Sequence, residues 1–97
     1  MPEKTNIQEL AEQGDTDAQF NLAICYSCEE DLTKDLEKAV YWYTKAAEQG
    51  NSDAHLNLAN CYYYGNGVRK NIKKAAFWYA IFAEQVDIAA NLILVNK

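Results

Sequence analysis

The stretch AEQGNSDAHLNLANCY at residues 47–62 repeats, with few changes, the stretch AEQGDTDAQFNLAICY at residues 11–26. When residues 11–50 are laid over residues 47–86 without a gap, 19 of the 40 pairs are identical. A fixed period of 36 residues is typical of arrays in which one pair of helices stacks on the next. The sequence therefore predicts an all-α fold.

Apolar residues at helical spacing indicate about six helices, two in each repeat and one at each end of the chain. They are predicted at residues 6–13, 16–28, 35–49, 52–64, 72–85 and 87–95. One bent helix over residues 72–95 is the alternative. Val86 stands there at the position of Gly50 and disfavours the left-handed turn that glycine allows.

The period divides one predicted repeat domain, residues 1–97, into four parts. These are an N-terminal half repeat at residues 1–14, repeat one at 15–50, repeat two at 51–86 and a C-terminal capping helix at 87–97. A chain of 97 residues lies near the small end of what can bury a useful core. We therefore expect a single domain.

Capping residues precede the predicted helix starts. Thr16 and Ser52 are the predicted N-caps of the first helix in each repeat, and Asp35 and Asn71 are those of the second. Residues 5–8 have the pattern of a capping box for the N-terminal helix.

The net charge of −5 is unevenly distributed. Residues 1–37 hold ten acidic residues against two lysines, whereas residues 38–82 hold six basic residues against two acidic ones. This pattern fits either solvated helix faces or a dipolar surface that orients a charged protein partner. The candidate steering residues are Glu29, Glu30, Asp31, Arg69, Lys70, Lys73 and Lys74. The acidic half would repel phosphate, so no nucleic-acid partner is expected.

The residues that usually carry chemistry are few. Cys25 and Cys28 form a Cys-x-x-Cys motif at the C-terminal end of a helix, whereas redox motifs place the thiolate at the N-terminal end. His55 is the only histidine and is expected to be solvated, and a zinc site needs three or four ligands. Cys25 and Cys61 are expected in buried packing. We predict no enzyme, no metal and no cofactor.

Cellular location and membrane binding follow from composition. Three cysteines cannot all pair within the chain, which suits a reducing compartment, and a cytoplasmic location is expected. The apolar runs are far shorter than the roughly 20 residues that a membrane-spanning helix needs, so no membrane partner is expected.

One combination of residues at fixed spacing resembles a known family. Ala54, Leu58, Ala59 and Tyr62 are followed by Gly65-Asn66-Gly67-Val68, and the second helix carries Lys38-Ala39, Trp42-Tyr43 and the run from Ala46 to Gly50. This pattern resembles the Sel-one-like repeat, a relative of the tetratricopeptide repeat, over residues 11–86. The resemblance implies a right-handed α-solenoid that serves as a protein-interaction scaffold.

In related solenoids, the face of the first helix opposite the core lines a concave groove. Here that face carries Phe20, Ile24, Asn60, Tyr63 and Tyr64, and binding hot spots favour tyrosine. Alternatively, Phe20 only helps the packing. We expect an adaptor that binds a protein or peptide on this concave face or on its loop edge. The alternative is a small inhibitor, such as an immunity protein or antitoxin, that masks a partner enzyme. A third hypothesis is an enzyme similar to the cysteine-rich bacterial members of this family.

The predicted C-terminal helix is apolar around most of its circumference. Its apolar residues are Ile88, Leu92, Ile93, Leu94 and Val95. A helix of this kind is normally covered on all sides. Either it forms a homodimer with a second copy, or it docks a different protein, or Ile81, Phe82 and Val86 wrap it in a monomer.

Overall fold

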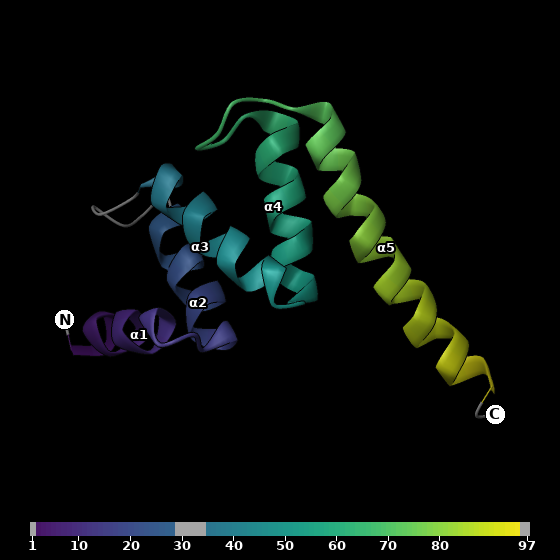
Figure 1. Ribbon diagram of the computed structural model, residues 1–97, viewed down its shortest axis with the longest axis horizontal. Coiled ribbons are helices and arrows are strands. Elements are labelled where there is room, and N and C mark those ends of the chain that lie inside the picture. Colours follow the sequence, from purple (N-terminus) through teal and green to yellow (C-terminus); the bar gives the residue numbers. More distant parts are fainter. Residues whose placement is uncertain (1, 29–34, 96–97) are drawn as a thin grey trace.

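The computed structural model describes residues 2–28 and 35–95, with side chains for residues 6–28 and 35–88. The described part contains five helices and no strand. The helices are α1 (Pro2–Glu12), α2 (Thr16–Ser27), α3 (Leu36–Glu48), α4 (Ser52–Tyr64) and α5 (Ile72–Val95). Each helix packs against the next one in the sequence, and the stack measures 46 × 29 × 23 Å (Figure 1). The all-α solenoid with a 36-residue period is confirmed.

Two glycines one period apart reverse the chain between repeats. Gly14 follows α1 with a φ of 102°, and Gly50 follows α3 with a φ of 96°. Glycine adopts such positive φ values without the steric cost that a side chain brings. Each reversal lets the next helix fold back against the previous one.

The N-cap of the first helix in each repeat lies one residue earlier than predicted. Asp15 and Asn51 are the N-caps, and their side chains accept hydrogen bonds from the backbone N–H three residues later, at 2.8 Å. Thr16 and Ser52 already lie inside the helices, so their prediction as caps is wrong. Aspartate and asparagine are as good as serine at this position, so composition alone does not select between adjacent candidates.

The second helix of each repeat starts as predicted. Asp35 accepts a hydrogen bond from the N–H of Lys38 at 3.1 Å, and Asn71 accepts one from the N–H of Lys74 at 3.0 Å. In both repeats the cap therefore satisfies an amide that has no partner inside the helix.

The N-terminal helix is longer than predicted. α1 begins at Pro2 rather than at residue 6, because proline at the first helical position has no N–H to leave unpaired and a φ that suits the helix. The predicted capping box thus lies inside α1. Ala11 is buried and Ile7 packs against the core, whereas Leu10 is exposed.

The core is continuous from one repeat to the next. Its largest fully buried side chains are Leu22 and Leu58, which are one period apart. Alanines fill most of the remaining core positions and allow close approach of the helices. These are Ala11, Ala18, Ala23, Ala39, Ala46, Ala47 and Ala54. The core therefore repeats with the same period as the sequence.

The predicted helices at residues 72–85 and 87–95 form one helix, α5, of 24 residues. The described residues hence contain five helices rather than six. Val86 lies at the position of Gly50, and a branched side chain disfavours the positive φ that reverses the chain there. The C-terminal part of α5 extends away from the other helices (Figure 1). Ile88 is exposed, whereas the predictions on Leu92, Ile93, Leu94 and Val95 fall outside the described side chains.

Candidate functional site

The five residues predicted to form the groove lie on α2 and α4. Ile24, Tyr63 and Tyr64 are exposed, and 66% of the Tyr64 surface is accessible. Phe20 and Asn60 are half-buried. Phe20 packs against the core, with its ring 6.0 Å from that of Tyr43. Phe20 thus has the packing role that was the alternative prediction.

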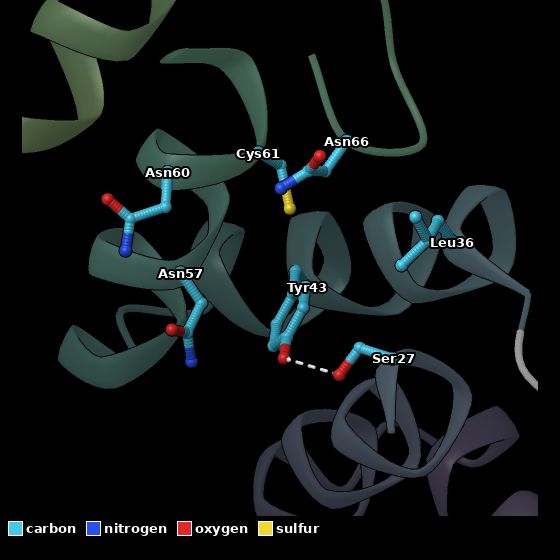
Figure 2. A pocket seen from close by; sticks show the side chains of 7 residues that line it. All are labelled: Ser27, Leu36, Tyr43, Asn57, Asn60, Cys61 and Asn66. Carbon is cyan, nitrogen blue, oxygen red and sulfur yellow. Dashed lines mark hydrogen bonds between the residues drawn. The ribbon is translucent and has the colours of Figure 1, made fainter. Parts of the chain in front are cut away.

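A pocket of about 250 Å³ is lined by residues of α2, α3, α4 and the loop after α4. Its lining residues are Ser27, Leu36, Tyr43, Asn57, Asn60, Cys61 and Asn66 (Figure 2). Figure 2 shows the hydroxyl of Tyr43 turned toward that of Ser27, and the two oxygens are 3.3 Å apart. The pocket therefore combines residues of both repeats.

Three amide side chains give the pocket its polar character. Asn57 and Asn60 come from α4, and Asn66 comes from the loop that follows it. Each carboxamide offers two N–H donors and one oxygen acceptor. The backbone of an extended peptide offers the same kinds of group, an N–H and a C=O at every residue except proline. The pocket can therefore form hydrogen bonds with a peptide main chain.

A row of tyrosines continues from the pocket toward the end of α4. The hydroxyl of Tyr79, on α5, donates a hydrogen bond to Oδ1 of Asn60. The ring centroid of Tyr79 is 6.4 Å from that of Tyr63, which lies 4.9 Å from that of Tyr64. Tyr79 thus connects Asn60 to Tyr63, and Tyr63 in turn contacts Tyr64.

Among the residues that line the pocket, the sequence predicted only Asn60 as a binding residue. Tyr43 is buried in the core, and it also lines the pocket. Tyr79 stands one period after Tyr43, so the repeat itself was a signal for it. Asn57 had no comparable signal, because its equivalent, Asn21, is exposed and does not line this pocket.

Burial sets the protonation of the groups around the pocket. It raises the pKa of the Tyr43 hydroxyl, and the hydrogen bond with Ser27 offsets part of that rise. Burial also raises the pKa of the Cys61 thiol. A raised pKa lowers the fraction of thiolate, which is the nucleophilic form. Cys61 is therefore a poor nucleophile at neutral pH.

The three cysteines are free thiols in the structure. Cys28 is exposed, whereas Cys25 and Cys61 are half-buried and thus less buried than predicted. In the case of Cys61, the reason is that one side of the residue faces the pocket.

The prediction that His55 is solvated is wrong. Only 3% of its surface is accessible. Its Nε2 donates a hydrogen bond to the carbonyl of Ala47 at 2.9 Å, and its Nδ1 lies 3.0 Å from Oε1 of Gln85. The ring stacks on Trp78 at 5.4 Å. Sequence reasoning took the polar side chain as a sign of exposure, although a buried imidazole is stabilised here by its bond to a backbone carbonyl and by stacking on Trp78.

Among the described residues, no cluster of histidine, cysteine, aspartate or glutamate could hold a metal ion. Similarly, no helix in the described ranges is long and apolar enough to cross a membrane.

The basic candidate steering residues are exposed. These are Arg69, Lys70, Lys73 and Lys74. The ammonium of Lys74 lies 5.4 Å from the centroid of the Tyr62 ring, and one period earlier Lys38 has the same contact with Tyr26. The acidic candidates Glu29, Glu30 and Asp31 lie outside the described residues.

Comparison with known proteins places both repeats in one family model. The model described as Sel1 repeat matches residues 16–51 and 52–87. Among curated proteins, the chain has no match.

Two solved structures are similar to the chain. One is a protective antigen present in uropathogenic Escherichia coli strains that displays an SLR fold; the identity is 38% and the TM-score 0.77, over 81% of this chain and 17% of that chain. The other is a Sel1 repeat protein from Oxalobacter formigenes, with 27% identity and a TM-score of 0.79, over 84% of this chain and 63% of that chain. The chain therefore spans less than two thirds of either relative.

Proposed function

The chain belongs to the Sel1 repeat family, and we propose that it is a non-enzymatic adaptor that binds a segment of another protein in the groove between its repeats. Sel1 repeat proteins are generally interaction modules without catalytic activity. The specific proposal concerns the groove, which we define as the pocket lined by Asn57, Asn60 and Asn66 together with the tyrosine row Tyr63, Tyr64 and Tyr79.

The observation that carries this proposal is the placement of amides beside exposed aromatic rings. The pocket is too small for a folded domain, but about 250 Å³ accommodates one or two side chains of a peptide. The amides can pair with the main chain of that peptide, which would otherwise lose hydrogen bonds to water. Tyr64 supplies a large, mostly exposed ring of the type that dominates binding energy at interfaces.

The expected partner is a protein or peptide in the cytoplasm. The three free thiols support a reducing compartment, since pairing is favoured only where the surroundings are oxidising. The exposed basic residues Arg69, Lys70 and Lys73 flank the loop beside the pocket and favour a partner segment that carries acidic residues.

Tyr64→Ala tests the groove, with Tyr41→Ala as its matched control. Both rings are exposed, at 66% and 53%, and each makes an edge contact with the aromatic residue next to it. Tyr41, however, lies on α3 away from the groove residues. Tyr64→Ala should weaken partner binding by about 2 kcal/mol, roughly 30-fold, if Tyr64 is a hot spot.

The measurement is a pull-down from the native host with quantitative mass spectrometry, followed by titration of the captured protein. Tyr41→Ala should capture the same partner as the parent chain does. If Tyr64→Ala and Asn57→Ala both bind that partner with parental affinity, the groove is not the binding site.

A further inference from the structure

One face of α5 lacks the neighbour that the equivalent face of α3 has. Ala47 on α3 is 3% exposed and Val40 is 9% exposed, whereas Ala83 and Ala76, one period later, are both exposed. The difference arises because α4 packs on α3, where His55 donates its hydrogen bond to the carbonyl of Ala47. No described helix occupies the corresponding place beside α5.

The uncovered stretch of α5 is apolar and hollowed. A depression of about 510 Å³ runs along it, lined by Phe77, Ala80, Ile81, Ala83, Glu84 and Asp87. Phe77, Val86 and Ile88 are large apolar side chains that are about half exposed. In solenoids, each repeat packs against its neighbours, and a face that is left to solvent is usually polar. An apolar face here indicates that something covers it.

One segment of the chain, residues 87–95, corresponds in the repeat to the helix that covers α3. One period before residues 87–95 lie residues 51–59, which form the start of α4 and its cap. Asp87 stands at the position of the cap Asn51, and Ala90 and Leu94 stand at the positions of Ala54 and Leu58. Ala54 and Leu58 are completely buried.

This segment cannot cover the face of its own α5. Residues 72–95 form one continuous helix, which at 1.5 Å per residue is about 36 Å long. Residues 87–95 therefore lie beyond residues 76–83 along the same axis and not beside them (Figure 1). Only a reversal at Val86, such as the one at Gly50, would bring them alongside.

We propose that two copies of the chain exchange residues 87–95. In this arrangement the two α5 helices lie antiparallel, with a two-fold axis near Val86. Residues 87–95 of each copy then cover residues 77–85 of the other, in the way that α4 covers α3 within the chain. Both contacts pair residues 87–95 of one copy with residues 77–85 of the other, so the two contacts are equivalent, as a closed two-fold dimer requires.

A second copy of the chain covers this face of α5, because the covering helix must have the side-chain spacing that the equivalent face of α3 accepts. Within the chain, the α3 face accepts a first helix with a small residue and a leucine four positions apart, Ala54 and Leu58, and residues 87–95 provide the same pair. Exchange of an identical element between copies needs no new complementary surface.

Sedimentation equilibrium at micromolar concentration tests the exchange with three variants and the parent chain. The parent should be a dimer. Ala83→Arg should be monomeric, because it places a charge in the proposed contact while residue 83 is exposed in the single chain. Asn21→Arg, an exposed residue of α2, is the control and should remain dimeric.

Val86→Gly tests the hinge. It restores the glycine found at residues 14 and 50, so residues 87–95 should fold back onto their own α5 and yield a monomer with unchanged helix content by circular dichroism. A monomeric parent, a dimer that withstands Ala83→Arg, or a Val86→Gly chain that stays dimeric would each overturn the proposal. If Val86→Gly loses helix content, the result with Ala83→Arg decides.

Discussion

At the scale of single residues, Gly67 shows how closely the loop after α4 approaches the neighbouring repeat. Its φ is 73°, and a Cβ at this position would lie 2.2 Å from the carbonyl oxygen of Leu36. That carbonyl belongs to the first turn of α3, so it cannot move without disturbing the helix start. Glycine at this position therefore allows the two repeats to meet.

Gly67→Ala should destabilise the protein more than Gly14→Ala does. Gly14 also has a positive φ, of 102°, but a Cβ there would meet no atom within 4 Å. Gly14→Ala thus carries only the backbone strain of about 1–3 kcal/mol, whereas Gly67→Ala adds a clash with backbone. Urea unfolding of both variants measures the difference. Equal losses would mean that the loop and α3 are not in contact in solution.

The N-caps were predicted correctly from the sequence where only one residue near the helix start is a good cap. Asp35 and Asn71 were predicted as caps because the residues next to them are poor caps. Thr16 and Ser52 failed because each follows a residue that caps equally well. The buried state of His55 was missed for a related reason: its partners Ala47 and Gln85 are distant in sequence.

At the scale of helices, glutamine and histidine side chains connect each repeat to the one before it. Gln19 donates a hydrogen bond to the carbonyl of Ala11 at 3.0 Å, as His55 does to Ala47 one period later at 2.9 Å. Gln49 in turn donates to Oε1 of Gln19 at 2.8 Å. The glutamine that recurs in the Ala-Glu-Gln motif is therefore a structural link between helices.

His55→Gln should be tolerated much better than His55→Ala. Glutamine already fills the equivalent position 19 and forms the same bond to the carbonyl eight residues earlier. Alanine would leave that buried carbonyl without this partner, at a cost of about 1–3 kcal/mol, and would also remove the stacking on Trp78. Thermal unfolding of the two variants compares them. A His55→Ala protein as stable as His55→Gln would show that the link contributes nothing.

The helices themselves were predictable, whereas the sequence left open whether residues 72–95 form one helix or two. The period and the apolar spacing located every helix in the described residues. At Val86, however, two tendencies compete: the repeat favours a reversal, and the branched side chain favours continued helix. Local sequence does not decide between them, and the contacts that could decide involve residues far along the chain.

At the scale of the whole molecule, stability depends on keeping Tyr43 uncharged. Burial raises the pKa of its hydroxyl above the ordinary value of 10.0, so the folded chain holds this proton more tightly than the unfolded chain does. The resulting stabilisation is complete below pH 10 and is lost as the pH rises through the folded-state pKa. Burial raises the pKa of Tyr79 as well, and the nearby Tyr64 and Tyr63 add to it.

The free energy of unfolding should therefore decrease as the pH rises above about 10, and it should decrease less in Tyr43→Phe. The variant cannot ionise at this position, although Tyr79 still can. Urea unfolding at a series of alkaline pH values gives the slope for both chains. If the two slopes are identical, ionisation of Tyr43 does not contribute to alkaline unfolding.

The candidate groove was predictable in part at this scale. Tyr63, Tyr64 and Asn60 were identified because they lie on the helix face opposite the core. Their connection through Tyr79 depends on how α5 packs against α4, and the pocket depends on the distance between two repeats. One sequence gives neither the packing of α5 against α4 nor the distance between the repeats. The role of these residues in binding therefore stays a prediction.

The bond from residue 55 to the carbonyl of Ala47 has a consequence for how such chains can evolve. Its donor lies in the first helix of one repeat, and its acceptor lies in the second helix of the repeat before. A tandem copy of a 36-codon stretch of the gene would reproduce a donor and an acceptor together, wherever the copy began. Recombination could therefore lengthen or shorten the protein in whole repeats. Each new boundary between repeats would then contain a donor and an acceptor at the positions of residue 55 and Ala47.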